Sequence, residues 1–362
     1  MRYLEPFVFL HLRNFWMSSI LEQEIYEQPD VIAHLIAVQS ETARQIAAAI
    51  RDFNPAFVWI AARGTSDNAA RYAQYLFAVH ARLAVGLATP SVHTLYEAAP
   101  DMSRALVIGV SQSGQSQDVR QVITDARAQG ALTVTITNDS ESPLAQGAAF
   151  HLALNAGAEK SVAATKSYTT ELTAFALIAA ALTDKTELWD GLAKLPAWAR
   201  TTLDAAQETE LWAQRYRYME RYAVIGRGYN YCTAFEISLK VKELSYIAGE
   251  GYSEADFRHG PIAMINSGFP VIVVAPSGAT LEQQRDLLVK LNEKGAECLA
   301  ISDDSSLAAL THHLMPLPVG MPEWISPITA VMPGQVFAMS LAKLRGNPVD
   351  QPRGLTKVTN TV

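Results

Sequence analysis

The chain has 362 residues, of which 49% are hydrophobic and 18% charged, and its net charge is −7 at pH 7. This length exceeds the size at which a single core stops growing, so the sequence predicts two ordinary globular domains rather than a disordered chain. The acidic balance argues against a nucleic-acid surface, which would be basic, and no basic run predicts binding to an anionic membrane.

The sequence gives no sign of export or of membrane insertion. No apolar stretch approaches the roughly 20 residues of a membrane-spanning helix, and the longest one, residues 174–182, is expected to be a buried helix. Residues 1–16 lack a clean apolar core and a small-residue cleavage site, so they are a poor signal peptide; either Met17 is the true start or residues 1–16 are a loose extension. Cys232 and Cys298 lie in or beside apolar segments, so we expect buried reduced thiols of a cytosolic protein rather than a disulfide.

The predicted elements begin with helices. Residues 17–52 are expected to be helical and interrupted only by Pro29, and Ser19 with Glu22 forms a capping-box pattern at the start. An α/β run follows, with strands expected at 57–62, 83–87, 105–110 and 132–137 and helices from about Asp67 and about Ser116. Short, nearly continuous apolar strands between helices predict a parallel sheet that is covered on both faces.

The second half of the chain is expected to repeat this organisation and to end in a tail. Its elements are expected in this order: one long Thr- and Ala-rich helix at 159–183, a helical connection at 189–217, a second α/β run from Arg221 to about Val319, a proline-broken loop, a final helix at 334–344, and a polar tail at 346–362. Such tails are usually solvated and disordered, but residues 350–357, Asp-Gln-Pro-Arg-Gly-Leu-Thr-Lys, are not of low complexity.

The two α/β runs resemble each other at an offset of 164 positions. Residues 57–64, Phe-Val-Trp-Ile-Ala-Ala-Arg-Gly, correspond to residues 221–228, Arg-Tyr-Ala-Val-Ile-Gly-Arg-Gly. Ser113-Gly114 falls on Ser277-Gly278, and a third landmark follows one residue out of step, where Gly130 meets Gly295. Three landmarks in one order indicate one α/β domain written twice. The sequence therefore predicts two tandem doubly wound parallel-sheet domains, each of three layers (α/β/α), followed by a C-terminal tail.

Only the first copy carries a hydroxyl-rich loop, Ser111-Gln-Ser-Gly-Gln-Ser116, where the second has Pro276-Ser-Gly. Because this loop follows a strand and opens a helix, its hydroxyls, its backbone N–H groups and the helix dipole would surround one point, which suits a phosphate. Ser66 would lie at the neighbouring strand end, where ligands of doubly wound sheets collect. Simple helix capping by Ser66 and Ser116 accounts for the same residues equally well. Because no P-loop lysine and no Gly-x-Gly-x-x-Gly are present, a phosphomonoester is favoured over ATP or NAD.

A charged helix in the second copy is the other candidate for chemistry. Glu236, Lys240 and Glu243 share one side of this helix at i, i+4 and i+7, a spacing that usually marks a solvated, salt-bridged face. Apolar flanks, and the run into Phe257-Arg-His-Gly-Pro261, favour instead a half-buried carboxylate whose pKa is raised for proton transfer. His259 on its rigid turn is a candidate general acid or base, although a lone histidine is more often structural.

Six segments of the chain together resemble the sugar isomerase (SIS) domain family. In order they are Gly64-Thr-Ser66, Ser111-Gln-Ser-Gly-Gln-Ser116, Ala156-Gly-Ala-Glu-Lys-Ser-Val-Ala-Ala-Thr-Lys166, Ala234-Phe-Glu-Ile-Ser-Leu-Lys-Val-Lys-Glu243, Phe257-Arg-His-Gly-Pro261 and Asp350-Gln-Pro-Arg-Gly-Leu-Thr-Lys357. The resemblance runs from about Met17 to Val362 and is closest to the isomerase portion of glucosamine-6-phosphate synthase. That synthase also has a glutaminase domain with a cysteine nucleophile, which has no counterpart here. The resemblance therefore implies a free-standing amino-sugar-phosphate deaminase.

The resemblance also implies roles for individual residues. The ligands of the phosphate and the sugar would be Ser66, Ser111, Gln112, Ser113 and Ser116, with Val162 and Ala163 lining the pocket. Glu243 would shuttle a proton between C1 and C2 with Lys240 beside it, and His259 from the partner subunit of a dimer would assist ring opening. Lys357 would approach the carbonyl carbon from the tail. The tail departs from the synthase, which has a serine after this lysine and a terminal glutamate, and this weakens the assignment of Lys357 as a Schiff-base former.

The implied function is that of glucosamine-6-phosphate deaminase (isomerising), which makes fructose 6-phosphate and ammonia. We expect a cytoplasmic homodimer with no nucleic-acid or membrane partner. No metal or organic cofactor is expected, because the substrate's own amine acts as the electron sink. The same residues would serve a fructosamine-6-phosphate deglycase or a galactosamine-6-phosphate deaminase/isomerase. From another class, a non-catalytic sugar-phosphate-sensing module is disfavoured by the presence of Glu243, His259 and Lys357.

The expected domain boundaries follow the repeat. Residues 1–52 would form an N-terminal extension and helices, residues 53–200 a first, phosphate-binding SIS domain, and residues 201–345 a second SIS domain with the catalytic Glu and His. Residues 346–362 would form a tail that closes the active site.

Overall fold

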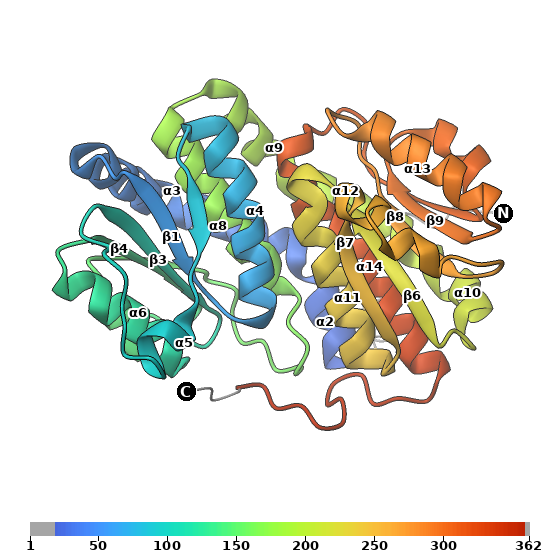
Figure 1. The fold of residues 1–362 in the computed structure, drawn as a ribbon, viewed down its shortest axis with the longest axis horizontal. Coiled ribbons are helices and arrows are strands. Elements are labelled where there is room, and N and C mark those ends of the chain that lie inside the picture. Colours follow the sequence, from blue (N-terminus) through green and yellow to red (C-terminus); the bar gives the residue numbers. More distant parts are fainter. Residues whose placement is uncertain (1–18, 359–362) are drawn as a thin grey trace, which may run out of the picture.

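The computed structural model describes residues 19–358, which form two lobes that lie side by side (Figure 1). The strands are β1 (Phe57–Ala61), β2 (Val85–Leu87), β3 (Ala105–Ser111), β4 (Leu132–Thr137), β5 (Phe150–Ala153), β6 (Arg221–Gly226), β7 (Ala248–Ser253), β8 (Pro270–Val274), β9 (Glu297–Ser302) and β10 (His313–Pro316). The α-helices are α2 (Ile20–Tyr26), α3 (Gln28–Phe53), α4 (Gly64–Ala81), α5 (Pro90–Thr94), α6 (Gln117–Ala128), α7 (Pro143–Gln146), α8 (Lys166–Thr183), α9 (Thr186–Ala205), α10 (Thr209–Ala213), α11 (Tyr231–Ser245), α12 (Glu254–Arg258), α13 (Leu281–Glu293) and α14 (Ser326–Leu344). Short 3₁₀ turns are η1 (Ala206–Glu208), η2 (Gln214–Tyr216), η3 (Gly228–Asn230), η4 (Pro261–Met264), η5 (Ser305–Leu310) and η6 (Glu323–Ile325).

The two sheets have the same strand order, as the internal repeat predicts. The first is ordered β2-β1-β3-β4-β5, and the second reads β7-β6-β8-β9-β10 from its opposite end. Every strand pair is parallel. This is a doubly wound order in which ligands collect outside the carboxyl ends of the strands. The prediction of two tandem three-layer α/β/α units is confirmed.

Helices between the sheets join the two lobes into one body. α8 packs against α3 and α4, and α11 packs against α14 and also against α4 of the first lobe. The largest apolar core runs through these helices and through the facing sides of both sheets. Smaller separate cores lie on the outer sides, under α6 in the first lobe and under α12 and α13 in the second. The carboxyl ends of the strands are thus held in a fixed relation across the boundary between the lobes.

Most predicted elements are confirmed, and the corrections concern helix boundaries. Ser19 caps α2 by accepting a hydrogen bond from the Glu22 backbone N–H, and Pro29 stands in the first turn of α3. The long helix predicted at 159–183 begins only at Lys166, and the final helix begins at Ser326 rather than Gly334 and runs through Pro333. α4 starts at Gly64, earlier than predicted, and the short strand β5 was not predicted. The suggestion that Met17 is the start concerns a part of the chain outside the described residues.

The two cysteines and the most apolar helix are buried, as a large core requires. Cys232 and Cys298 are both buried and unpaired with each other, as predicted. Within the described residues, the segment Glu323–Leu344 is long and apolar enough to pass as a membrane span, which the sequence reading did not anticipate. Its apolar window is completely buried inside the protein, as in the core helix of a globular fold.

The loop of the second lobe that corresponds to the hydroxyl-rich loop is filled by the chain's own carboxylates. Glu323 accepts a hydrogen bond from the Ala279 backbone N–H at 2.7 Å and another from the Thr280 hydroxyl at 3.1 Å. Asp303 accepts from the Ser277 backbone N–H at 2.6 Å. A side chain on Gly278 would collide with Glu323, so the glycine is required by this close approach. Carboxylates therefore occupy the helix start at which an anion would otherwise bind.

The first prediction tests this internal anion. Glu323→Ala removes two hydrogen bonds at the start of α13, so we expect a loss of about 1–2 kcal/mol in the free energy of unfolding, measured by denaturant titration. The matched control is Glu282→Ala, which removes an exposed acid from the first turn of the same helix and should change stability by less than about 0.5 kcal/mol. Equal effects of the two substitutions would show that Glu323 does not hold this loop.

Candidate active site

One hollow of about 350 Å³ lies where the carboxyl ends of the strands face the tail. Nine of the predicted site residues line it: Ser66, Ser111, Gln112, Ser113, Ser116, Val162, Lys240, Glu243 and Lys357. They come from both lobes and from the tail. Chain segments that are far apart in sequence are therefore brought together as the repeat and the motifs predict.

The hydroxyl-rich loop forms one wall of the hollow. Ser111 ends β3, Ser116 directly precedes α6, and Gly114 between them adopts a φ of 64°, which favours glycine. The Ser111 hydroxyl accepts a hydrogen bond from the Gly114 backbone N–H at 3.2 Å, and the Ser113 hydroxyl accepts one from the Gln115 N–H at 3.3 Å. The Ser116 side chain makes no capping bond to α6. Simple helix capping by Ser116, the alternative explanation, is therefore not what the structure shows.

A buried charge cluster forms the opposite wall. The Lys240 ammonium lies 2.6 Å from Glu243 and 3.4 Å from Glu236, all on α11. Glu236 is completely buried and accepts hydrogen bonds from Asn68 at 2.8 Å and from Thr65 at 3.1 Å, both on α4 of the first lobe. Only Glu243 of the three keeps part of its side chain exposed, 22%, and it lines the hollow. The alternative of a solvated, salt-bridged face is therefore wrong.

The electrostatics of this cluster follow from its burial. Burial alone would lower the pKa of Lys240, but the neighbouring carboxylates of Glu243 and Glu236 raise it well above the usual value. Lys240 therefore stays an ammonium at neutral pH. Burial raises the pKa of Glu236, and Lys240 and the hydrogen bond from Asn68 partly offset this rise. The cluster is a fixed positive charge held between two acids, of which one faces the hollow.

Figure 1 shows the tail crossing from the second lobe to the first. Its residues Leu355 to Val358 line one side of the hollow. Asp350 anchors it, because its carboxylate accepts from the Leu21 backbone N–H at 2.8 Å and its carbonyl accepts from Val162 N–H at 3.0 Å. Further along, the Lys357 ammonium lies 2.7 Å from the buried carboxylate of Glu159. Burial would raise the pKa of Glu159, but Lys357 and hydrogen bonds from Ser167 and Thr165 hold it below its usual value. The described part of the tail is ordered by specific contacts and is not a free end.

Two of the predicted site residues do not line the hollow within this chain. Ala163 is buried in the core, and its neighbour Ala164 lines the hollow in its place. His259 caps the end of α12, where it is exposed, and is not part of the wall. The resemblance assigns His259 to the partner subunit's site, which is compatible with this exposed position.

Sequence reasoning missed two buried acids near the hollow, Glu159 and Glu171. Glu159 pairs with Lys357 and accepts hydrogen bonds from the backbone N–H groups of Thr165 and Ser167 at 3.0 Å each, which fixes the start of α8. Glu171 lines the hollow from α8 and accepts a hydrogen bond from Ser66 at 2.7 Å. The usable signal for Glu171 was a lone acid in an otherwise apolar and Thr-rich helix, because a carboxylate that is buried there needs a functional or structural reason.

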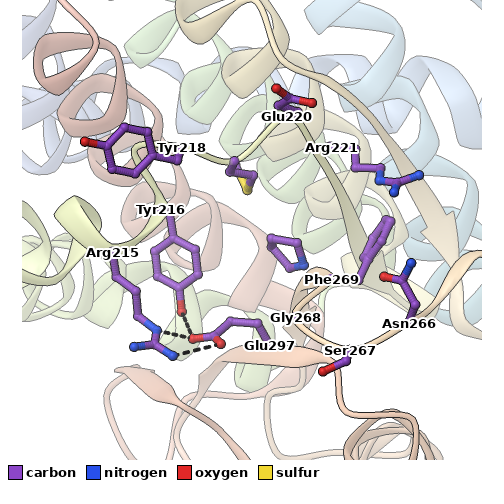
Figure 2. Close-up of a pocket in the computed structure, with 12 residues that line it drawn as sticks. Arg215, Tyr216, Tyr218, Glu220, Arg221, Asn266, Ser267, Gly268, Phe269 and Glu297 are labelled. Atoms are coloured by element: carbon purple, nitrogen blue, oxygen red, sulfur yellow. Dashed lines mark hydrogen bonds and ion pairs between the residues drawn. The ribbon is translucent and has the colours of Figure 1, made fainter.

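A larger hollow of about 630 Å³ lies at the opposite edge of the second sheet (Figure 2). Its wall includes Arg221, Pro270 and Glu297, which are the first residues of β6, β8 and β9. In Figure 2 the Arg215 guanidinium and the Tyr216 hydroxyl both point to the carboxylate of Glu297, so this arginine is already paired. Because ligands of doubly wound sheets collect at the carboxyl ends of the strands, we favour the smaller hollow as the active site.

No group of three or more His, Cys, Asp or Glu side chains in residues 19–358 is arranged to hold a metal ion.

Comparison with known proteins agrees with this geometry. Residues 57–181 and 217–345 each match the family model of the SIS domain. The chain is 34% identical over 341 residues to glutamine–fructose-6-phosphate aminotransferase (isomerizing) of Aquifex aeolicus, a match that covers 92% of this chain and 56% of that protein. It thus spans about half the length of the curated relatives that it matches.

Solved structures share the fold over nearly their whole length. The C-terminal domain of glucosamine-fructose-6-phosphate aminotransferase from Francisella tularensis superposes with a TM-score of 0.84 at 24% identity, covering 93% of this chain and 99% of that one. Glucosamine-6-phosphate deaminase from Thermotoga maritima gives a TM-score of 0.78 at 22% identity, covering 95% and 100%. With two family-model matches that together span more than half of its residues, the chain belongs to the SIS domain family.

Proposed function

We propose that the chain converts glucosamine 6-phosphate and water to fructose 6-phosphate and ammonia. The observation that carries this proposal is that the hydroxyl-rich loop and the Glu243–Lys240 pair face one hollow of about 350 Å³. This volume lies within the range of small-molecule sites. One end of the hollow offers neutral donors for a phosphate, and the other offers a carboxylate for proton transfer.

The phosphate end is the Ser111–Ser116 loop with its helix. Backbone N–H groups and hydroxyls at the start of α6 complement an anion without a paired positive charge. Arg63, which also lines the hollow, lies 2.6 Å from the buried Asp118 and is therefore already committed to an ion pair. Binding by neutral donors suits a sugar phosphate that must leave again after the reaction.

The reacting end is Glu243. Once the sugar ring is open, its carboxylate takes the hydrogen of C2 as a proton and returns a proton to C1. The oxygen of C1 also gains a proton and the amine gives one up, so that the double bond moves from C1=O to C2=N. Water then adds to C2 of the imine. The nitrogen leaves C2 as ammonia, and the ketone of fructose 6-phosphate remains. Glu236 lies behind Lys240 with its oxygens bonded to Asn68 and Thr65, so it is poorly placed to reach the sugar. The Lys240 ammonium would keep a positive charge beside the base, Glu243, and beside the negative charge that develops on the C1 oxygen of the sugar.

The deaminating direction follows the family resemblance, and free ammonia is proposed in place of glutamine because of the chemistry of the two thiols. Relatives with 32–36% identity are aminotransferases that isomerise a phosphorylated sugar with nitrogen from glutamine. Taking ammonia from glutamine needs a nucleophile, and burial raises the pKa of both thiols of this chain, Cys232 and Cys298, to about 12. Neither is therefore a usable thiolate at neutral pH. The described residues suit a reaction that uses or releases free ammonia.

The remaining roles follow the family resemblance. Lys357 would approach the carbonyl carbon of the open sugar from the tail, where Glu159 now pairs with it. His259, exposed at the end of α12, would open the ring of a substrate bound to the partner subunit of a homodimer. We place this dimer in the cytoplasm, where reduced thiols and phosphorylated sugars are found.

Ammonia release from a panel of phosphorylated sugars tests the proposed function. We expect the purified chain to release ammonia from glucosamine 6-phosphate and to form fructose 6-phosphate in equal amounts. Ammonia from fructosamine 6-phosphates or from galactosamine 6-phosphate alone would favour those alternatives. Tight binding of these sugars without turnover would favour a sensing module and contradict the proposal.

The second prediction concerns the phosphate end. Ser113→Ala removes a hydroxyl whose bond to a phosphate is worth roughly 1.5–3 kcal/mol, so we expect KM for the phosphorylated sugar to rise about tenfold or more. The matched control is Ser277→Ala at the corresponding position of the second lobe, which should leave KM unchanged. An unchanged KM in Ser113→Ala, or equal activity on unphosphorylated glucosamine, would show that the loop does not bind phosphate.

The third prediction separates the two acids of α11. Glu243→Gln is nearly isosteric and should still bind fructose 6-phosphate, but it should lose several orders of magnitude in kcat because no base can reach C2. Exchange of the C2 hydrogen of glucosamine 6-phosphate with deuterated water, followed by NMR, should stop as well. Glu236→Gln should keep measurable exchange. Near-normal exchange in Glu243→Gln together with its loss in Glu236→Gln would reverse the assignment.

A further inference from the structure

Glu171 is a buried acid in the wall of the proposed active site to which the mechanism above gives no role. It is the lone acidic residue of α8 and is only 1% exposed. Nevertheless it lines the hollow together with Ser66 and the hydroxyl-rich loop. An ionised carboxylate in this position would put negative charge beside a ligand that is itself a dianion.

The contacts of Glu171 leave one of its oxygens without a partner. The Ser66 hydroxyl lies 2.7 Å from Oε1, whereas Oε2 is buried and has no hydrogen-bond partner among the described residues. Burying an unpaired carboxylate oxygen is costly, and the cost is much smaller when the group is protonated and neutral. The contacts alone therefore favour a neutral acid.

The surrounding charges act in the same direction. Burial is the main reason why the pKa of Glu171 rises to about 8, and the neighbouring acids Glu159 and Glu236 add to the rise. The hydrogen bond from Ser66 and the charge of Lys357 lower it in part. The other charged groups around the hollow and α8 are already in ion pairs: Lys240 with Glu243, Arg63 with Asp118, and Lys166 with Glu27 of the α2–α3 boundary.

We propose that neutral Glu171 positions Ser66 as a hydrogen-bond donor to the ligand, so that the hollow binds an anionic sugar phosphate and one proton together. An ionised carboxylate can only accept, so it ties the single proton of Ser66 to Oε1 and turns only oxygen lone pairs towards the ligand. A neutral acid can instead donate to Ser66, which frees the Ser66 proton for a phosphate or sugar oxygen. Ionisation of Glu171 thus removes the Ser66 hydroxyl as a donor to the ligand and adds a negative charge that repels the anionic ligand. This inference rests on the proposed function for its ligand class, but it concerns binding and not turnover.

The acid itself can be observed without any ligand. In the wild-type protein we expect one carboxyl group that titrates between about pH 7 and pH 9, seen by infrared difference spectroscopy or by NMR of ¹³C-labelled glutamate. This titration should be absent in Glu171→Gln and present in Glu282→Gln, whose acid is exposed in the second lobe. A wild-type protein without such a titrating carboxyl group would overturn the proposal.

Coupling to the ligand is measured by calorimetry with fructose 6-phosphate, which carries no amine that titrates in this range. The second ionisation of a phosphate ester lies near pH 6, so the ligand keeps its charge between pH 7 and pH 9.5. We expect wild-type affinity to be about tenfold or more weaker at pH 9.5 than at pH 7, and binding at pH 8.5 to take up protons, read from the dependence of the heat on the buffer. The Glu171→Gln protein should take up no proton on binding, and its affinity should be the same at pH 7 and pH 9.5. The Glu282→Gln protein should keep both the proton uptake and the weaker binding at pH 9.5.

The outcomes separate this inference from the proposed function. Ammonia release without proton uptake on binding overturns the role of Glu171 and leaves the proposed function standing. Proton uptake without ammonia release overturns the deaminase and leaves the role of Glu171 standing. Inorganic phosphate is the second probe, and absence of proton uptake with both ligands in the wild-type protein overturns the coupling whatever the variants do.

Discussion

The structure depends on one buried ammonium, that of Lys240, which lies between Glu236 and Glu243. A charge in this position is tolerated only because both acids compensate it, and Glu236 is itself held by Asn68 and Thr65 of the first lobe. The same contacts therefore satisfy a buried charge, connect α11 to α4 across the boundary between the lobes, and present Glu243 to the hollow. Removing one member would leave the others buried without partners, which couples stability to the geometry of the site.

The two copies of the duplicated domain contribute different parts of the proposed active site. Both lobes offer a loop and a helix start at the carboxyl edge of a sheet, but the second lobe fills its own with Glu323 and Asp303. The first lobe leaves Ser111–Ser116 open to the hollow. An internal carboxylate thus takes the place of a bound anion in one copy. The second copy instead contributes α11, so one complete site needs both lobes as well as the tail.

The strand pattern and the local motifs could be predicted because they depend on residues that are neighbours in the sequence. Contacts between residues that are far apart in the sequence could not be predicted in this way. Apolar strands and the serine loop were predicted from a few adjacent residues each. Gly249 and Gly251 in β7 are needed because the Tyr222 ring and the backbone of α11 press on this strand, and these contacts are visible only in the fold. Glu171 was missed because its partner, Ser66, is 105 residues away. The local sequence motifs identify residues that could take part in a reaction. Only the fold shows which acidic side chains lie beside them.

The central claim is that one ligand spans the hollow, with its phosphate on the serine loop and its C1–C2 bond beside Glu243. A crystal structure of the Glu243→Gln protein with fructose 6-phosphate tests this most directly. The account predicts phosphate oxygens within hydrogen-bond distance of the Ser111–Ser116 loop and C1 and C2 within about 3.5 Å of the side chain at position 243. A phosphate bound instead in the hollow of Arg215 and Arg221, or a sugar that points away from α11, would contradict it.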